Sequence, residues 1–312
     1  MKKSLLALIA LSAIGSAQAQ SSVTVYGVVD VGFAKQTGKD LIQRENHASR
    51  LGFRGVEDLG NGLSAVFTLE NEFLLDSGLQ KGVFWERQAN VGLTGAFGTA
   101  IFGRTKNLVD SVQSKVEPFG ADGVIGKVNE PMMRVGVSSS RVSNSVTYTS
   151  PKVAGAFSGS VQYVLSEIDG ASDGMGFLGQ YDKGPVFAYV GYEKPAETRA
   201  GTEQPAMWTV GGYYKFGALR LSGQYAQGDT KAAAGEYTGM LLGAVYTIGK
   251  GDLKAVVSKQ RQDTATFEKD TVKEIGFGYD YHLSKRTDLY AYAGRERVSA
   301  VTSYQVGISH KF

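Results

Sequence analysis

The sequence predicts an all-β fold in which sixteen antiparallel strands form one sheet, and three observations support this. Apolar and polar residues alternate with a period of two along most of the chain, which is typical of strands with two different faces. Glycine makes up 41 of 312 residues, about 13% against an average of about 7%. The six prolines all fall where we expect strand ends or loops, because a central strand cannot spare an N–H group.

Residues 1–19 are expected to be a signal peptide that is removed on export. Lys2 and Lys3 precede the apolar stretch Leu5–Ile14, and Ala17-Gln18-Ala19 has the small residues of a cleavage site. The apolar stretch is too short for a membrane helix, which needs about 20 residues. Cleavage lowers the formal charge from +3 to 3 − 2 = +1, so the basic pI is no reason to expect nucleic-acid binding. Residues 20–312 are then expected to form a single domain.

The predicted strands are apolar on one face and polar on the other. In the segment 271–284, Ile275, Phe277 and Tyr279 alternate with glycine and acidic residues. Short clusters rich in glycine, such as Gly249-Lys250-Gly251, separate the segments and indicate turns. The sixteen predicted strands are 22–34, 49–58, 62–73, 83–95, 98–105, 142–150, 155–165, 174–183, 185–193, 206–216, 218–227, 237–248, 252–260, 271–284, 288–297 and 302–312.

Two environments accept so many one-sided strands. A soluble sandwich or propeller buries the apolar faces, whereas a transmembrane β-barrel turns them to lipid and lines its lumen with the polar faces. The polar faces here are rich in Gly, Ser, Gln, Lys and Arg, and the turns alternate between very short and longer, which favours the barrel. In a closed barrel the strand ending at Phe312 must pair with the first strand, because an open edge in lipid costs several kcal/mol per unpaired group.

One long segment, 107–134, interrupts this regularity. It has no sustained two-residue alternation and contains Pro118 and Pro131. A loop of this length within a compact domain is usually functional. We therefore expect residues 107–134 to fold into the mouth of the barrel and narrow it.

Seven motifs are distinctive in combination: SVTVYGVVD (22–30), SRLGFRGVEDLG (49–60), RQANVGL (87–93), FGTAIFGR (97–104), NSVTY (144–148), LSKRTDLY (283–290) and VGISHKF (306–312). Together they resemble the Gram-negative general porin family, in its beta-proteobacterial branch. The resemblance implies a homotrimeric sixteen-stranded barrel in the outer membrane, with the third external loop, 107–134 here, as an inward-folded constriction loop. It also implies contacts with outer-membrane lipid and lipopolysaccharide, and assembly by the barrel-assembly machinery through Phe312.

The candidate site is a set of charged residues at the pore constriction. Arg50 and Arg54 share a polar strand face, so both are expected to point into the lumen. Two further arginines match wall positions of the porin family, and three loop carboxylates are expected to face them across the pore. The alternative is that all are ordinary solvated lumen charges. The seven candidates are Arg50, Arg54, Arg87, Arg141, Asp110, Glu117 and Asp122.

The motif around Glu117 departs from the family pattern. Residues 116–120 read VEPFG, in which Glu and Pro are exchanged relative to the Pro-Glu-Phe-Gly turn of other porins. The resemblance therefore does not define where the Glu117 carboxylate points. The sign of the ion preference depends on the few residues at the neck and does not follow from the net charge.

Other function classes find little support in the sequence. The chain has no cysteine, and its three histidines, His47, His282 and His310, are not spaced like metal ligands. No serine lies in a nucleophile elbow, so no enzyme activity, cofactor or metal is expected. The favoured function is a general outer-membrane porin for passive diffusion of small hydrophilic solutes and ions. A substrate-selective porin for sugars or organic anions remains the alternative, followed by a barrel adhesin.

Overall fold

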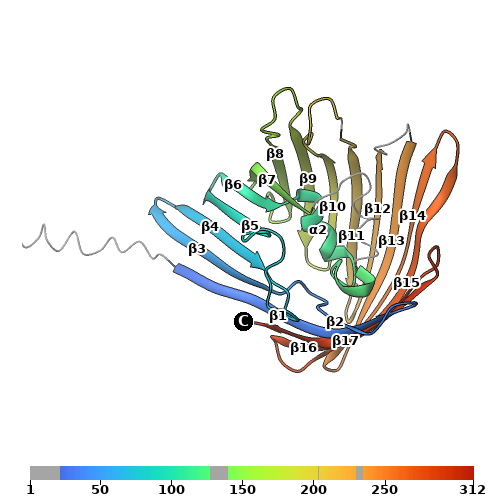
Figure 1. Cartoon of the computed structure of the whole chain (residues 1–312). Helices are drawn as coiled ribbons and strands as arrows, with labels where there is room; N and C mark the ends of the chain where they lie inside the picture. Colours follow the sequence, from blue (N-terminus) through green and yellow to red (C-terminus); the bar gives the residue numbers. More distant parts are fainter. Residues whose placement is uncertain (1–21, 127–139, 203, 230–234) are drawn as a thin grey trace, which may run out of the picture.

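The chain forms a closed antiparallel β-barrel (Figure 1). The computed structural model describes residues 22–126, 140–202, 204–229 and 235–312, so the expected signal peptide and residues 127–134 lie outside the described residues. Within these ranges the sheet contains sixteen long strands and one short strand, β2 (Ile42–Arg44). The long strands are β1 (Ser22–Gln36), β3 (Arg50–Gly60), β4 (Leu63–Glu72), β5 (Gln88–Gly95), β6 (Gly98–Lys106), β7 (Arg141–Thr149), β8 (Phe157–Val164), β9 (Gly174–Lys183), β10 (Val186–Lys194), β11 (Met207–Phe216), β12 (Leu219–Asp229), β13 (Gly235–Ile248), β14 (Gly251–Thr264), β15 (Glu268–His282), β16 (Thr287–Glu296) and β17 (Val301–Lys311).

Strand β1 closes the barrel by pairing with different strands along its length. Its first half pairs with β3, its second half pairs with β17, and β2 adds a short pairing beside that second half. At the seam, the N–H group of Gly27 donates to the Phe312 carbonyl and the N–H group of Phe312 donates to the Gly27 carbonyl, both at 3.1 Å. The expected pairing of the last strand with the first is confirmed.

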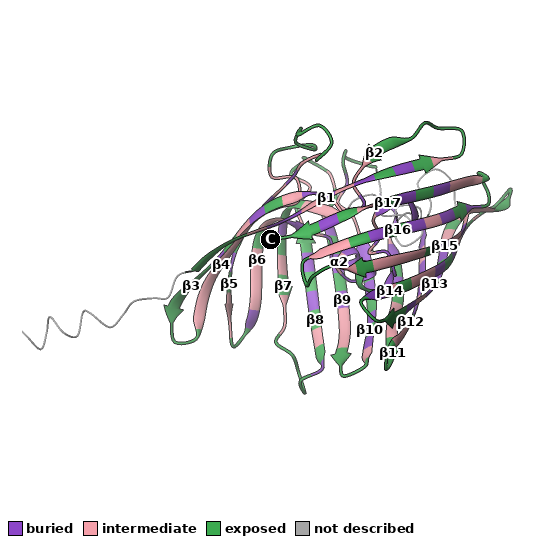
Figure 2. Ribbon diagram, turned by 90° about the horizontal axis from the view of Figure 1, so that it is seen from below, coloured by how far each residue is buried: buried purple, intermediate pink, exposed green. Residues whose placement is uncertain are grey.

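The apolar faces of the strands point outward. Phe157 and Phe277 are 54% and 56% exposed, whereas the inward-facing Gln162 is 2% exposed. Figure 2 shows this alternation of exposed and buried residues along the ribbons of β8 and β9. A soluble sandwich would bury the apolar faces and expose the polar ones. The arrangement is that of a barrel whose outer surface contacts lipid.

All sixteen predicted segments correspond to long strands, and the largest boundary error is at the start of β5. The sequence pattern predicted a strand over 83–95, whereas β5 begins at Gln88. The residues before it belong to the loop that follows β4: Gly82 has a φ of +65°, and the apolar side chains of Val83 and Phe84 are exposed there. No helix among the described residues is long and apolar enough to cross a membrane.

The two ends of the barrel differ in the length of their connections. At one end two residues, such as Asn61-Gly62 or Gly249-Lys250, join consecutive strands. At the other end the connections are longer, as in residues 73–87 and 195–206. Because outer-membrane barrels have short periplasmic turns and longer external loops, we assign the long connections to the outside of the cell.

The helix α2 (Leu108–Val116) lies inside the barrel and was not predicted. The side chain of Asn107 caps its first turn by accepting from the N–H group of Asp110. Its apolar residues contact the inner wall in two places. One cluster contains Leu108, Val112, Val116, Leu178, Phe187 and Tyr189, and the other contains Val109, Met207 and Ala226. The apolar residues at 108, 109, 112 and 116 have helical spacing, which a search for two-residue alternation does not detect.

Glycines on the inner wall make room for the chain that follows α2. A Cβ atom on Gly243 would lie 2.4 Å from Cγ of Pro118, and one on Gly276 would lie 2.6 Å from Cγ2 of Ile125. Real Cβ atoms do not come this close to other atoms. The segment 117–126 therefore lies directly against β13 and β15.

We predict that Gly243→Ala lowers the single-channel conductance. The added methyl group would push Pro118, whose ring cannot rotate away, off the wall and toward the pore axis. Planar-bilayer recordings measure this effect. Gly159→Ala is the matched control, because a Cβ atom there would have no neighbour nearer than 4.0 Å. Equal conductance in both variants and the parent protein would show that the loop is not held in this way.

Candidate pore constriction

The segment that contains α2 divides the space inside the barrel. The outer cavity, of about 290 Å³, opens toward the external loops and is lined by residues such as Arg44 and Lys81. The inner vestibule, of about 700 Å³, opens toward the short turns and is lined by Gly217 and Ala218 among others. Ser114 and Gly120 line both spaces, so this segment separates them.

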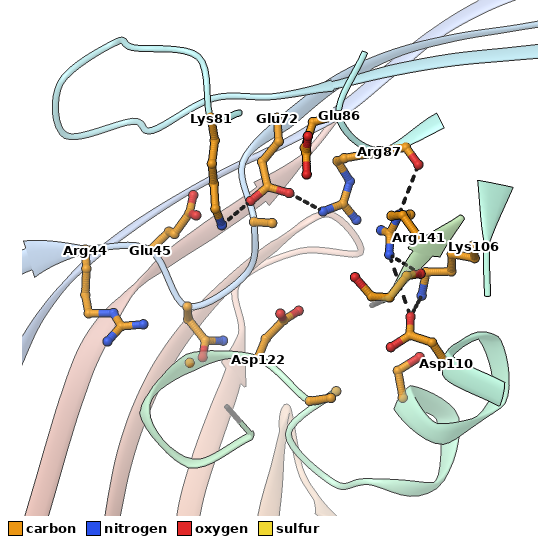
Figure 3. Close-up of a pocket in the computed structure, with 17 residues that line it drawn as sticks. Arg44, Glu45, Glu72, Lys81, Glu86, Arg87, Lys106, Asp110, Asp122 and Arg141 are labelled. Carbon is orange, nitrogen blue, oxygen red and sulfur yellow. Dashed lines mark hydrogen bonds and ion pairs between the residues drawn. The ribbon is translucent and has the colours of Figure 1, made fainter. Parts of the chain in front are cut away.

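A chain of ion pairs lies on the wall of the outer cavity (Figure 3). Arg87 pairs with Glu70, and its Nη1 lies 2.6 Å from Oε2 of Glu72. Lys81 pairs with the other oxygen of Glu72, at 2.5 Å. Burial alone would lower the pKa values of Arg87 and Lys81, but the adjacent carboxylates outweigh it and raise both pKa values above their ordinary values. Both side chains are therefore cationic at physiological pH.

Arg141 connects this wall to α2. Its Nε donates to the carbonyl oxygen of Arg87 at 3.0 Å, and its Nη1 lies 3.7 Å from Oδ2 of Asp110. The same oxygen lies 3.4 Å from Nζ of Lys106. Two cations of the wall thus face one carboxylate of the helix, and this arrangement holds the helix N-terminus beside β6 and β7.

Arg50 and Arg54 follow one another on the inner face of β3. Nη1 of Arg50 donates to the Ala48 carbonyl at 2.9 Å, and no carboxylate among the described residues lies within 4.0 Å of its guanidinium nitrogens. Arg50 is nevertheless close enough to Arg87 and Asp122 to interact with both electrostatically. Arg54 lies four residues further along β3, toward the periplasmic end, with its guanidinium 5.3 Å from the centre of the Tyr26 ring.

The remaining loop carboxylates have different environments. Asp122 lines the outer cavity, and its Oδ2 lies 3.2 Å from Nδ1 of His47. Glu117 is 1% exposed, and its Oε2 accepts from the backbone N–H groups of Phe119 and Ala121, both at 2.7 Å. The Glu117 carboxylate therefore shapes the turn after α2.

Comparison with known proteins identifies the family. The sequence model described as Gram-negative porin matches residues 5–300. The protein belongs to the Gram-negative porin family. It is 32% identical over 357 residues to outer membrane porin protein 32 of Delftia acidovorans and 30% identical over 391 residues to an outer membrane porin protein of Bordetella pertussis, with 100% of both chains covered in each case. These relatives place the porin in the outer membrane.

Solved structures agree with the barrel. The anion-selective porin from Comamonas acidovorans superposes with a TM-score of 0.81 at 27% identity, covering 94% of this chain and 100% of that one. Salmonella typhi OmpF, in complex with daunomycin, has a TM-score of 0.72 at 17% identity, with 93% and 97% covered, and supports the fold alone.

Four of the seven predicted residues line the outer cavity of the porin: Arg87, Arg141, Asp110 and Asp122. Arg50 lies beside it, Arg54 lies further along the wall, and Glu117 lines the inner vestibule. Their role in ion selection stays a prediction.

Sequence reasoning missed the acidic residues on the arginine side. Glu70 and Glu72 lie on the inner face of β4, directly opposite Gly52 and Arg50 of β3. Two acids two residues apart, on the strand next to that of Arg50 and Arg54, are the signal that could have revealed them. With them, the described lining of the outer cavity contains five basic residues (Arg44, Lys81, Arg87, Lys106, Arg141) and five acidic residues (Glu45, Glu72, Glu86, Asp110, Asp122).

We predict that Arg50→Ala shifts the ion preference of the porin toward cations. A unit charge about 10 Å from a passing ion contributes about 0.4 kcal/mol in water, so the cation-to-anion permeability ratio should rise roughly two- to fourfold at low salt and less at high salt. The zero-current potential across a salt gradient measures this ratio. Lys152→Ala is the control, since it removes the same charge from an exposed ion pair in a turn. An unchanged ratio in Arg50→Ala would place this arginine outside the constriction.

Proposed function

We propose that this protein is a general diffusion porin, which forms a water-filled channel for small hydrophilic solutes and ions. The observation that carries the proposal is the mixed charge around the outer cavity, whose described lining has five basic and five acidic residues. Its described lining includes no aromatic side chain on which a sugar ring could stack. Such a lining offers water and ions a path and no shaped site for one solute.

The constriction is proposed to lie where residues 107–126, the described part of the loop, face the wall of β3 to β7. The ion pairs of Arg87 and Arg141, together with the Arg50 guanidinium, would produce a field across the pore. Asp110 and Asp122 stand on the loop side of the same space, as Figure 3 shows. Arg54 and Glu117 would act on ions that have reached the periplasmic side.

An anion-selective channel is the second candidate. The relative from Comamonas acidovorans is described as anion-selective. In support, Arg50 has no carboxylate within ion-pair distance among the described residues, whereas Arg87 is neutralised by Glu70 and Glu72. Arg50 thus adds to this wall a positive charge that no described carboxylate offsets within ion-pair distance.

We also propose that the porin is a homotrimer whose subunits meet through β1 and β3 to β6. Tyrosine and tryptophan form belts where a barrel meets the membrane interfaces. The described parts of β1 and β3 to β6 carry neither residue on their outward faces, since Tyr26 points inward to Glu70. The exposed members of the belt lie on other strands: Tyr148, Tyr163, Tyr192, Trp208, Tyr214, Tyr246, Tyr281 and Tyr304.

We predict that spin labels on Val91→Cys and Leu242→Cys differ in their accessibility to oxygen dissolved in the bilayer. The two side chains are 57% and 65% exposed in the single chain, at the middle of β5 and β13. Contact between subunits should shield position 91 and leave position 242 open to lipid. The porin has no native cysteine to interfere. Equal accessibility at both positions would argue against this interface.

Residues 1–19 are proposed to direct export. Three further partners complete the proposal: outer-membrane lipid and lipopolysaccharide, which surround the barrel, and the barrel-assembly machinery, which contacts Phe312. The ring of Phe312 lies against Gly27 at the seam of the barrel.

We predict that the purified porin inserted into a planar bilayer gives large, weakly selective current steps that often occur in threes. A salt gradient across the same bilayer would report the ion preference. Saturable block by one sugar, or by one organic anion but not by others of the same charge, would favour a substrate-selective porin. Failure to observe any step would contradict a channel and favour an adhesin.

A further inference from the structure

Five lysine and arginine side chains among the described residues line the inner vestibule, and they fall into two groups. Lys254 lies 2.5 Å from Asp280, and Lys311 lies 4.0 Å from Asp288. The other three have no carboxylate within 4.0 Å among the described residues. They are Lys115, Lys215 and Arg220, which we call the vestibule cation cluster.

Two members of the vestibule cation cluster are neighbours across strands. Lys215 of β11 and Arg220 of β12 lie directly opposite each other in the sheet register. Like charges in this arrangement destabilise a sheet. A polar, uncharged residue at either position would avoid that cost, so the pair requires an explanation other than barrel stability.

Aromatic rings hold the cluster without neutralising it. The charged groups of Lys215 and Arg220 each lie 5.4 Å from the centre of the Tyr213 ring, and that of Lys115 lies 5.2 Å from the Phe187 ring. The two rings stack with their centres 5.3 Å apart. Cation–π contacts orient these side chains but leave their full positive charge in place.

The end of α2 supplies the third member. Lys115 lies in the last turn of the helix, and its carbonyl oxygen accepts from Nη1 of Arg220 at 3.3 Å. A helix C-terminus carries a partial negative charge that attracts cations. Arg220 therefore brings the helix end and the wall together, with the three cations on one side of the vestibule.

The nearest carboxylates are engaged elsewhere. Those that act on Arg220 belong to Glu117 and Asp252. Glu117 accepts backbone hydrogen bonds within its own loop, and Asp252 accepts from Thr247 and contacts His282. Neither forms an ion pair with the cluster.

We propose that Lys115, Lys215 and Arg220 form a binding site for small multivalent oxyanions, such as phosphate or polycarboxylates, on the periplasmic side of the constriction. The proposal rests on the proposed channel function, because the ligand reaches the site through the water-filled vestibule. Arginine presents a planar fork that matches two oxyanion oxygens, and the lysines add point charges. Coulomb attraction grows with the charge of the ligand, so multivalent anions bind more strongly than chloride.

The first test is block of chloride current by citrate in single-channel recordings. Citrate is expected to reduce the current of the parent porin in a saturable manner. Lys215→Gln combined with Arg220→Gln should raise the half-blocking concentration roughly tenfold, which corresponds to about 1.4 kcal/mol. Lys311→Gln is the matched control, because it removes a cation of the same vestibule that has a carboxylate partner.

The outcomes separate this inference from the proposed function. If the parent porin gave no current steps, the channel itself would be contradicted. If it conducted normally and citrate failed to block, or if Lys311→Gln weakened the block as much as the double variant, only the vestibule site would be overturned.

A second test does not depend on block and uses the absence of native cysteine. Lys215→Cys keeps Lys115 and Arg220 in place and creates one reactive thiol beside them. We expect it to react faster with an anionic than with a cationic thiosulfonate reagent, and inorganic phosphate should slow the anionic reaction. Thr247→Cys, in the same vestibule beside Asp252, is the control. Equal reagent preference at both positions, without protection by phosphate, would overturn the site.

Discussion

The structure depends on one constraint, that no backbone N–H or C=O group of a membrane-spanning segment can remain unpaired in lipid. An antiparallel sheet meets it only by closing on itself, and β1 provides the closure by pairing with β3 along one half and with β17 along the other. Closure fixes the direction of every side chain, because alternate residues must then point to lipid or to the lumen. The exposed phenylalanines and the buried glutamines of neighbouring strands are two results of this one geometry.

Backbone hydrogen bonds close the barrel, so its inner wall can contain buried charges and glycines that would weaken a soluble protein. Glu70, Glu72 and Arg87 are largely shielded from bulk water and stabilise one another, and glycines leave room for the chain after α2. Arg87 lies in ion-pair contact with Glu70 and Glu72, whereas Arg50 has no ion-pair partner among the described residues. The field inside the barrel therefore depends on the partners of each arginine as well as on the number of arginines.

Much of the fold could be predicted from the sequence, since alternation with a period of two is a local property. It revealed the strands and the inward direction of Arg50 and Arg54, and its failure at 107–134 marked the loop. Arg87 and Arg141 were found only through the resemblance. The predicted strand 83–95 included Arg87, which precedes β5, and the predicted strand 142–150 left out Arg141, the first residue of β7. The contacts between loop and wall could not be predicted. Whether Glu117 points to the pore or to its own backbone depends on the turn that follows α2, and strand periodicity carries no information about it.

The position of α2 in the chain has a consequence for assembly. Leu108, Val112 and Val116 pack against residues of β9 and β10, which follow the helix in the sequence. The helix therefore cannot dock until later strands have been laid down beside one another, and its contacts are non-local ones that form slowly. The segment around α2 therefore takes its place only after the part of the wall formed by β9 and β10 exists.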